Sequence, residues 1–172
     1  KKVNSLYLSD YIRDEYFQAS KKILIKKKKN IICYNPRKSS IFFKKFIKLN
    51  SDINFIPLIN FSLKEMISIL SKSKIYIDFG FHPGQDHLPR EAAILKNCII
   101  TNKEGSAAIY NDVPIKNEFK FDEKKKNFSK IRNKINLIFN NFSKEYKKFE
   151  YYRRYLYAQE KKFENQIFKI FN

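Results

Sequence analysis

Short apolar runs alternate with amphipathic segments through the middle of the chain. The runs are rich in Ile, Phe and Tyr, which is typical of buried strands. The segments between them place apolar residues three and four positions apart, which is typical of helices that cover a sheet. The predicted strands are residues 30–34, 53–59, 75–79 and 98–101, with 119–121 as a fifth, and the predicted helices are residues 39–49, 62–72, 89–96, 128–139 and 143–171.

This alternation predicts an α/β protein with a Rossmann-like, doubly wound parallel sheet and a long C-terminal helix. We divide the chain into a linker or N-terminal extension (1–29), a Rossmann-like domain (30–140) and a basic amphipathic helix (141–172). The four-lysine run at 26–29 is predicted to be a solvated turn. The chain begins without Met, so we expect it to be a fragment of a longer protein.

Composition adds a strong positive charge to this outline. The formal net charge is +19, from 36 Lys and Arg residues against 17 Asp and Glu. Most of the basic residues are Lys, and Arg, which makes bidentate contacts with phosphates and bases, is scarce. We interpret most of the charge as the codon bias of an AT-rich genome. The rest suggests an anionic partner, with a membrane surface favoured over nucleic acid. Cys33 and Cys98 lie in apolar runs and are expected to be buried thiols.

The glycines point to a site. The chain has three glycines, Gly80, Gly84 and Gly105, and all lie between residues 79 and 114. Ligands bind to parallel sheets at the carboxyl ends of the strands, which selects the loops 35–40, 79–88 and 102–114. Because glycine permits positive φ and a close approach of the backbone to a ligand, we expect a binding site in these loops.

The helix that follows residue 88 is predicted to receive an anion. Pro89 fits its first turn, Asp86 is a candidate N-cap, and the free N–H groups favour a diphosphate. Arg90 would add a bidentate fork for the phosphates. Glu91 would accept hydrogen bonds from vicinal hydroxyls such as those of ribose.

Further candidates come from the loops on either side of this helix. His82 is the candidate catalytic residue, as a general acid or base or as a donor to a phosphate or sugar oxygen. Gly105 and Ser106 would hold a phosphate or a sugar hydroxyl, and Arg37 and Lys38 would face the same cleft. The histidines, His82 and His87, show no standard metal-ligand spacing together with Asp86, so no metal or other cofactor is predicted.

These residues resemble the C-terminal, nucleotide-sugar-binding domain of GT-B glycosyltransferases. The resemblance covers residues 30–140, and its specific part is the segment HPG-x-D-x-x-PREAA followed by CIIT and KEGSAA. It implies that Glu91 binds the ribose, that Arg37 and Lys38 hold the diphosphate, and that Gly105 and Ser106 lie near the donor sugar. One position departs from the family pattern, because Pro83 stands where an acidic residue is usual.

The resemblance also implies partners and a location. The donor is a nucleotide-sugar, the acceptor is a surface polysaccharide or a glycolipid, and an N-terminal GT-B domain completes the enzyme. We expect the protein in the cytoplasm, peripheral at the inner face of the plasma membrane. Two alternatives stay open: a basic nucleic-acid-binding module, and a Rossmann-type nucleotide-binding domain without transferase activity.

Overall fold

The computed structural model describes residues 8–171 and contains one four-stranded parallel sheet within that range. The strands are β1 Lys29–Tyr34, β2 Asn54–Pro57, β3 Ser73–Asp78 and β4 Cys98–Thr101, in the order β2-β1-β3-β4. All three neighbouring pairs are parallel, which confirms the α/β prediction. The expected fifth strand is reduced to one bridge between Thr101 and Lys120.

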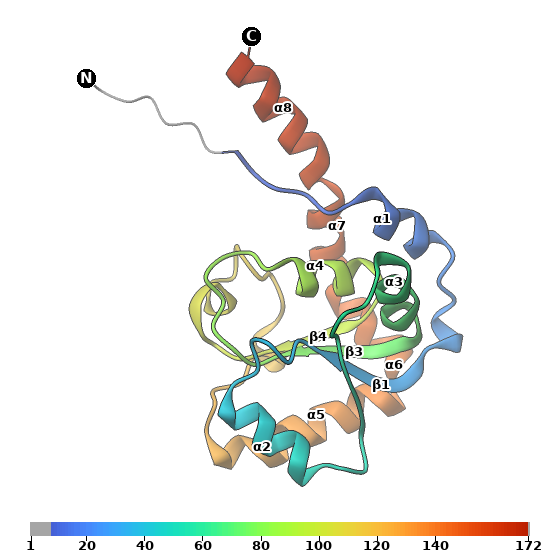
Figure 1. Cartoon of the computed structure of the whole chain (residues 1–172), viewed down its shortest axis with the longest axis vertical. Coiled ribbons are helices and arrows are strands. Elements are labelled where there is room, and N and C mark those ends of the chain that lie inside the picture. The colour runs from blue at the N-terminus through green and yellow to red at the C-terminus, as the bar shows by residue number, and fades with distance from the viewer. Residues whose placement is uncertain (1–7, 172) are drawn as a thin grey trace, which may run out of the picture.

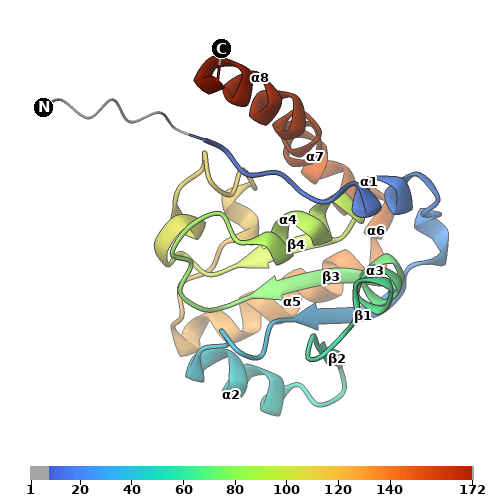
Figure 2. The ribbon, with the colours of Figure 1, turned by 45° about the horizontal axis from the view of Figure 1, so that its top comes forward.

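Helices cover both faces of the sheet (Figures 1 and 2). α2 (Ile41–Leu49) and α5 (Phe128–Asn140) lie on one face, and α3 (Leu63–Lys72) and α4 (His87–Ile94) lie on the other. α1 (Asp14–Lys21) packs on α3 and α4. The short 3-10 helices before α5 are η1 Ile25–Lys27, η2 Gly105–Ala108, η3 Asn117–Phe119 and η4 Lys125–Asn127.

Serine side chains fix the starts of two helices. Ser62 and Glu65 form a capping box, because each side chain accepts from the other residue's backbone N–H. Ser40 caps α2 by accepting from the backbone N–H of Phe43 at 3.2 Å. Its own N–H donates to the carbonyl of Phe79 at 2.7 Å, which ties the start of α2 to the end of β3.

The C-terminal region is helical, as predicted, but it is divided into segments: α6 Phe142–Glu145, η5 Tyr146–Phe149, α7 Glu150–Tyr157 and α8 Gln159–Phe171. Phe149, Tyr152 and Leu156 repeat at three and four positions and are all buried in the core. In α8 only Gln159 is buried, and the rest of that helix extends away from the body of the molecule (Figure 1).

The core forms on both sides of the central strands. β3 and β4 are buried along nearly their whole length, as expected for parallel strands with helices on both faces. Cys33 and Cys98 are buried free thiols, which confirms the prediction. Within residues 8–171 no helix combines the length and the apolarity needed to cross a membrane.

The run 26–29 is not the fully solvated turn that the sequence predicts, because Lys28 is buried. Its ammonium donates to the carbonyls of Leu70 at 3.0 Å and Ser73 at 2.7 Å, at the C-terminal end of α3. The Leu70 carbonyl also accepts from the Ser73 hydroxyl and the Ser73 carbonyl from the Asn97 side chain, so Lys28 shares with them the task of pairing carbonyls at the helix end. Burial lowers the pKa of Lys28 to about 7.

We expect the stability of the protein to rise with pH between 7 and 9 because of Lys28. Its pKa is about 7 in the folded protein, against an ordinary value of 10.5. The unfolded chain therefore binds more protons in this range, which adds at most about 1.4 kcal/mol of stability per pH unit. Urea unfolding at several pH values measures this slope.

Lys28→Met is the matched control, because it removes the titrating group. The slope between pH 7 and 9 should become smaller in the variant by close to one proton equivalent. Above pH 9 the thiol of Cys33, whose pKa burial raises to about 11, contributes in the opposite direction, so the window ends there. Identical slopes in the two proteins would contradict the buried position of Lys28.

Candidate functional site

The order of the strands locates the most favourable place for a ligand. The chain leaves β1 toward β2 on one side and returns to β3 on the other, so the topological switch point lies between β1 and β3. Open parallel sheets bind ligands in the crevice at the carboxyl ends of the two strands at such a point. The loops that follow β1, β3 and β4 meet at this edge.

Backbone hydrogen bonds hold these loops against one another. The N–H of Asn102 donates to the carbonyl of Asp78 at 3.2 Å, and the N–H of Ser106 donates to the carbonyl of His82 at 2.8 Å. The side chain of Asn102 also donates to the carbonyl of Gly80 at 2.7 Å. The loop after β4 is therefore fastened along the loop after β3.

The glycines permit close contacts within the protein. A Cβ at Gly80 would lie 2.0 Å from the carbonyl oxygen of Lys38, and a Cβ at Gly105 would lie 2.0 Å from that of His82. Gly105 also has a φ of +57°. Gly84 has open space around it, and its carbonyl accepts from the Ser106 hydroxyl at 2.6 Å. Gly80 and Gly105 thus let the loops approach one another, and Ser106 holds the loop around Gly84.

A chain of charged side chains runs across this edge. Lys38 contacts Oδ1 of Asp86, whose Oδ2 lies 2.9 Å from Nδ1 of His82. Nε2 of His82 lies 3.8 Å from Oδ1 of Asp78, and the other oxygen of Asp78 accepts from the Tyr76 hydroxyl at 2.8 Å. Lysine, aspartate, histidine and aspartate therefore follow one another from the surface to the interior.

Each group in this chain has a pKa set by burial and by its neighbours. Burial raises the pKa of Asp78. Burial opposes the ionisation of Asp86, but His82 and Lys38 outweigh it and lower the pKa. Burial alone would lower the pKa of His82, but the two carboxylates outweigh it and raise the pKa. The histidine is 1% exposed, so its ring faces the two carboxylates and not the solvent.

A cavity of about 210 Å³ lies beside this charged chain. It lies at the carboxyl ends of β1 and β3 and is lined by Asn35, Lys38, Asp78, Asp86, His87 and Leu88. Asp86 is the N-cap residue of α4, but its carboxylate makes no capping hydrogen bond because Lys38 and His82 hold it. The amino end of α4 and the ammonium of Lys38 both favour an anion in the cavity, whereas the carboxylates of Asp78 and Asp86 oppose one.

A second cavity of about 330 Å³ adjoins the first, because His87 lines both. Its other lining residues are Tyr11, Arg13, Tyr16, Leu63 and Glu91. Burial raises the pKa of Glu91, while a hydrogen bond with the Tyr16 hydroxyl and nearby cations lower it in part. Glu91, the residue predicted to bind ribose, therefore lies in a hollow that is also lined by two tyrosines.

Arg90 lies outside both cavities. Its guanidinium is 2% exposed and donates to the Asp10 carboxylate at 3.0 Å, to the Asp10 carbonyl at 3.1 Å and to Gln159 at 2.7 Å. One residue along a helix is a rotation of about 100°, so Arg90 faces the N-terminal segment and α8 while Glu91 faces the cavity. The structure gives Arg90 a structural position in place of the predicted contact with phosphate.

Lys38 and Arg37, the two residues predicted to hold the diphosphate, also occupy different places. Lys38 lines the first cavity, whereas Arg37 is exposed and does not line either of the two cavities. Asp78 is not among the predicted residues, although a carboxylate at the end of a buried strand is a usual sign of a site. Tyr16 is not among them either, because only the packing of α1 on α4 brings it to Glu91.

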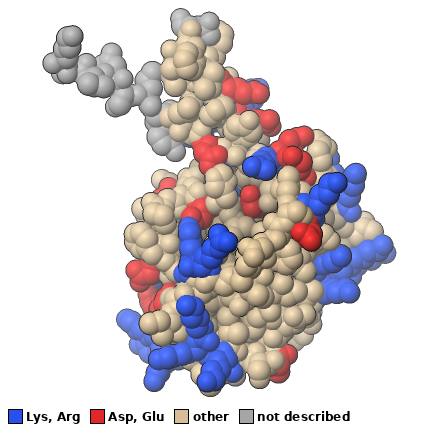
Figure 3. All heavy atoms as spheres, viewed as in Figure 1, with Lys and Arg blue, Asp and Glu red and all other residues tan. Residues whose placement is uncertain are grey.

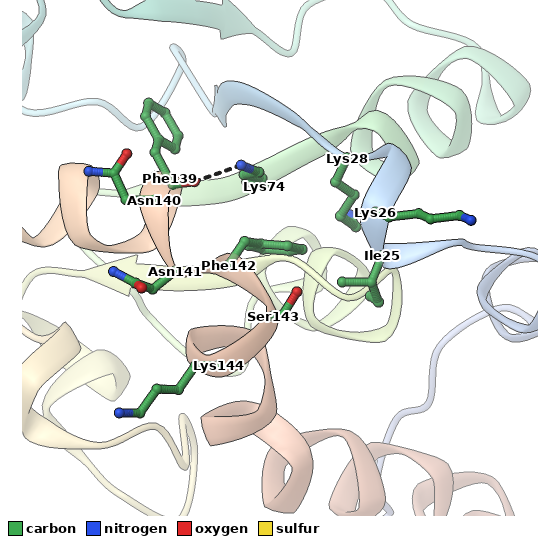
Figure 4. Close-up of a pocket in the computed structure, with 10 residues that line it drawn as sticks. All are labelled: Ile25, Lys26, Lys28, Lys74, Phe139, Asn140, Asn141, Phe142, Ser143 and Lys144. Atoms are coloured by element: carbon green, nitrogen blue, oxygen red, sulfur yellow. Dashed lines mark hydrogen bonds between the residues drawn. The ribbon is translucent and has the colours of Figure 1, made fainter.

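A basic hollow of about 410 Å³ lies at the opposite end of the sheet (Figure 4). Lys28 and Lys74 line it, together with residues of the segment 139–144. Lys74 donates to the carbonyl of Phe139 at 2.7 Å and to Asn30 at 2.6 Å, just as Lys28 donates to carbonyls at the end of α3. Both ammonium groups therefore have a structural use at helix C-termini.

The fold and the site together define an α/β protein with a Rossmann-like parallel sheet and a polar pocket at its topological switch point. No protein-family model, curated protein or solved structure matches the chain significantly.

Proposed function

We propose that this chain is the donor-binding domain of a GT-B-type glycosyltransferase, an enzyme that transfers a sugar from a nucleotide-sugar to a surface polysaccharide or a glycolipid. The observation that carries the proposal is the pair of adjoining cavities at the switch point. One has a cation and a helix amino end, and the other has a carboxylate and two tyrosines. These are the groups that a nucleoside diphosphate requires.

The first cavity suits the diphosphate. Lys38 is 36% exposed and held by Asp86, so its ammonium is placed at the cavity before a ligand arrives. The uncapped amino end of α4 adds the positive end of a helix dipole. Charge that develops on the leaving diphosphate would be stabilised by the same groups, which is how such a site would accelerate transfer.

The second cavity suits the nucleoside. Glu91 would accept hydrogen bonds from the ribose hydroxyls, and Tyr11, the exposed one of the two tyrosines, would stack on the base, which is worth about 1–3 kcal/mol. An N-terminal domain would bind the acceptor, so the chain alone should bind the donor and transfer poorly. Its basic side chains would place the enzyme at the inner face of the plasma membrane.

Calorimetry with UDP, GDP, CMP, ADP and their sugar conjugates tests the proposal at about 150 mM salt, where loose charge attraction is screened. We expect selective binding of one base. Glu91→Gln should weaken it about 10- to 100-fold, because a hydrogen bond to a charged group is worth about 1.5–3 kcal/mol. Lys38→Met should lower the affinity for nucleoside diphosphates more than the affinity for nucleosides.

Glu150→Gln and Lys26→Met are the matched controls, because both residues are exposed and far from the two cavities. Neither should alter binding. Weak and equal binding of all nucleotides together with tight, salt-sensitive binding of DNA would refute the proposal in favour of a nucleic-acid module. On the face in Figure 3, however, Lys and Arg stand in separate groups with Asp and Glu between them.

A further inference from the structure

Three side chains at the switch point converge on one small volume. Asp78 ends β3, His82 follows in the next loop, and Asp86 precedes α4. Each residue offers one possible ligand atom, and these three atoms, a ring nitrogen and two carboxylate oxygens, all lie within 4.8 Å of one another. Asp78 and Asp86 also line the cavity between β1 and β3, so the cluster is open to a ligand from that side.

Each carboxylate has one oxygen held from outside and one turned toward the imidazole. Oδ2 of Asp78 accepts from the Tyr76 hydroxyl, while its Oδ1 faces His82. Oδ1 of Asp86 is held by Lys38, while its Oδ2 faces His82. Outer hydrogen bonds of this kind orient the ligands of metal ions in proteins.

The histidine supplies an independent observation. It is 1% exposed, and neither ring nitrogen has a well-directed hydrogen bond to any atom of residues 8–171. Oδ2 of Asp86, 2.9 Å from Nδ1 of His82, is likewise buried without a well-directed hydrogen bond in that range. Buried polar atoms nearly always have well-directed hydrogen bonds, so atoms that face one another at these distances without such bonds suggest a shared partner that the protein itself does not supply.

We propose that Asp78, His82 and Asp86 bind a divalent transition-metal ion. Carboxylate oxygens and an imidazole nitrogen are ligands for zinc and manganese, and the imidazole disfavours calcium and magnesium. Ligand atoms bonded at about 2.0–2.2 Å lie at most about 4.4 Å apart, so the cluster needs to contract by a few tenths of an ångström.

Three protein ligands leave coordination positions open toward the cavity. Lys38 balances one of the two carboxylates, so with a neutral imidazole the cluster keeps a net negative charge that attracts a cation. A diphosphate oxygen in the cavity would complete the coordination of the ion. This last step rests on the proposed donor-binding function, whereas binding of the ion alone does not.

The first experiment titrates the full chain with manganese and zinc ions after treatment with EDTA and without nucleotide. We expect one ion per chain by calorimetry. Tyr76→Phe removes only the hydroxyl that holds Asp78, and it should weaken the binding of the ion about 10- to 100-fold, the loss usual for residues that orient a metal ligand. Asp78→Asn changes a ligand itself, so it should weaken the binding at least as much. Asp52→Asn, which changes an exposed carboxylate that lines neither cavity, should leave the affinity for the ion unchanged.

A His87→Gln variant allows a test without changing any ligand. His82 is then the one histidine left in the chain, and its imidazole NMR signal should broaden on addition of substoichiometric manganese. An unaffected signal would overturn the proposal even if the ligand variants fail to fold. Equal affinity of the wild type, Asp78→Asn and Tyr76→Phe would overturn it as well.

The outcomes for the ion and for the nucleotide are separable. Binding of the ion without binding of any nucleotide would support the metal site and refute the donor function. Selective nucleotide binding by a chain that takes up no ion would refute the metal site and leave the donor function standing.

Discussion

Gly105→Ala is expected to lower the free energy of unfolding by about 2–4 kcal/mol. A residue with a side chain is strained at a φ of +57°, and the new Cβ would lie 2.0 Å from the carbonyl oxygen of His82. That carbonyl also accepts from the N–H of Ser106, so the clash opens the contact between the loops after β3 and β4. Urea denaturation followed by circular dichroism measures the loss.

Gly84→Ala is the matched control for this substitution. A Cβ at Gly84 would meet nothing within 4 Å, and its φ is not in the left-handed region. We expect a change below about 0.5 kcal/mol, which is usual for exposed positions without special contacts. Equal losses in the two variants would show that glycine is needed for a reason other than the approach of the two loops.

Arg90→Met is expected to lower the free energy of unfolding by about 2–4 kcal/mol while leaving the affinity for nucleotides unchanged. The guanidinium joins α4 to Asp10 in the N-terminal segment and to Gln159 at the start of α8. Its removal leaves the buried Gln159 without this donor and removes a charge-assisted hydrogen bond. Thermal unfolding measures the loss, and calorimetry with the selected nucleotide measures the affinity.

Arg154→Met is the control for Arg90, because it makes the same chemical change at an exposed arginine. It should alter stability by less than about 0.5 kcal/mol. If Arg90→Met instead left stability unchanged and abolished nucleotide binding, the result would contradict the position of Arg90 in the structure. It would support the predicted contact of Arg90 with phosphate.

The charged chain from Lys38 to Asp78 gives the two proposals a common element. Asp86 holds Lys38 at the surface and faces His82 in the interior, so a change at either end alters the orientation of the other. The donor-binding proposal uses the surface end, where the ammonium meets the diphosphate. The metal proposal uses the interior end, where the imidazole lacks well-directed partners.

The sequence by itself determined the local elements and the general place of the site. Strand and helix periodicity depends on the spacing of apolar residues, and the capping box at Ser62 depends on neighbours in sequence. The alternation of elements predicts a parallel sheet, and such a sheet places its loops at one edge. The candidate residues Lys38 and Glu91 could therefore be assigned to the vicinity of a cleft from the sequence.

Only the tertiary structure decided which side chains face a ligand. Arg90 and Glu91 are adjacent in sequence, but the neighbours of α4 bury one and leave the other in a cavity. Lys28 looks like its exposed neighbours in sequence, yet the C-terminal end of α3 lies over it. The physical reason is that burial and hydrogen-bond partners depend on segments far apart in the chain, to which a local pattern of residues does not respond.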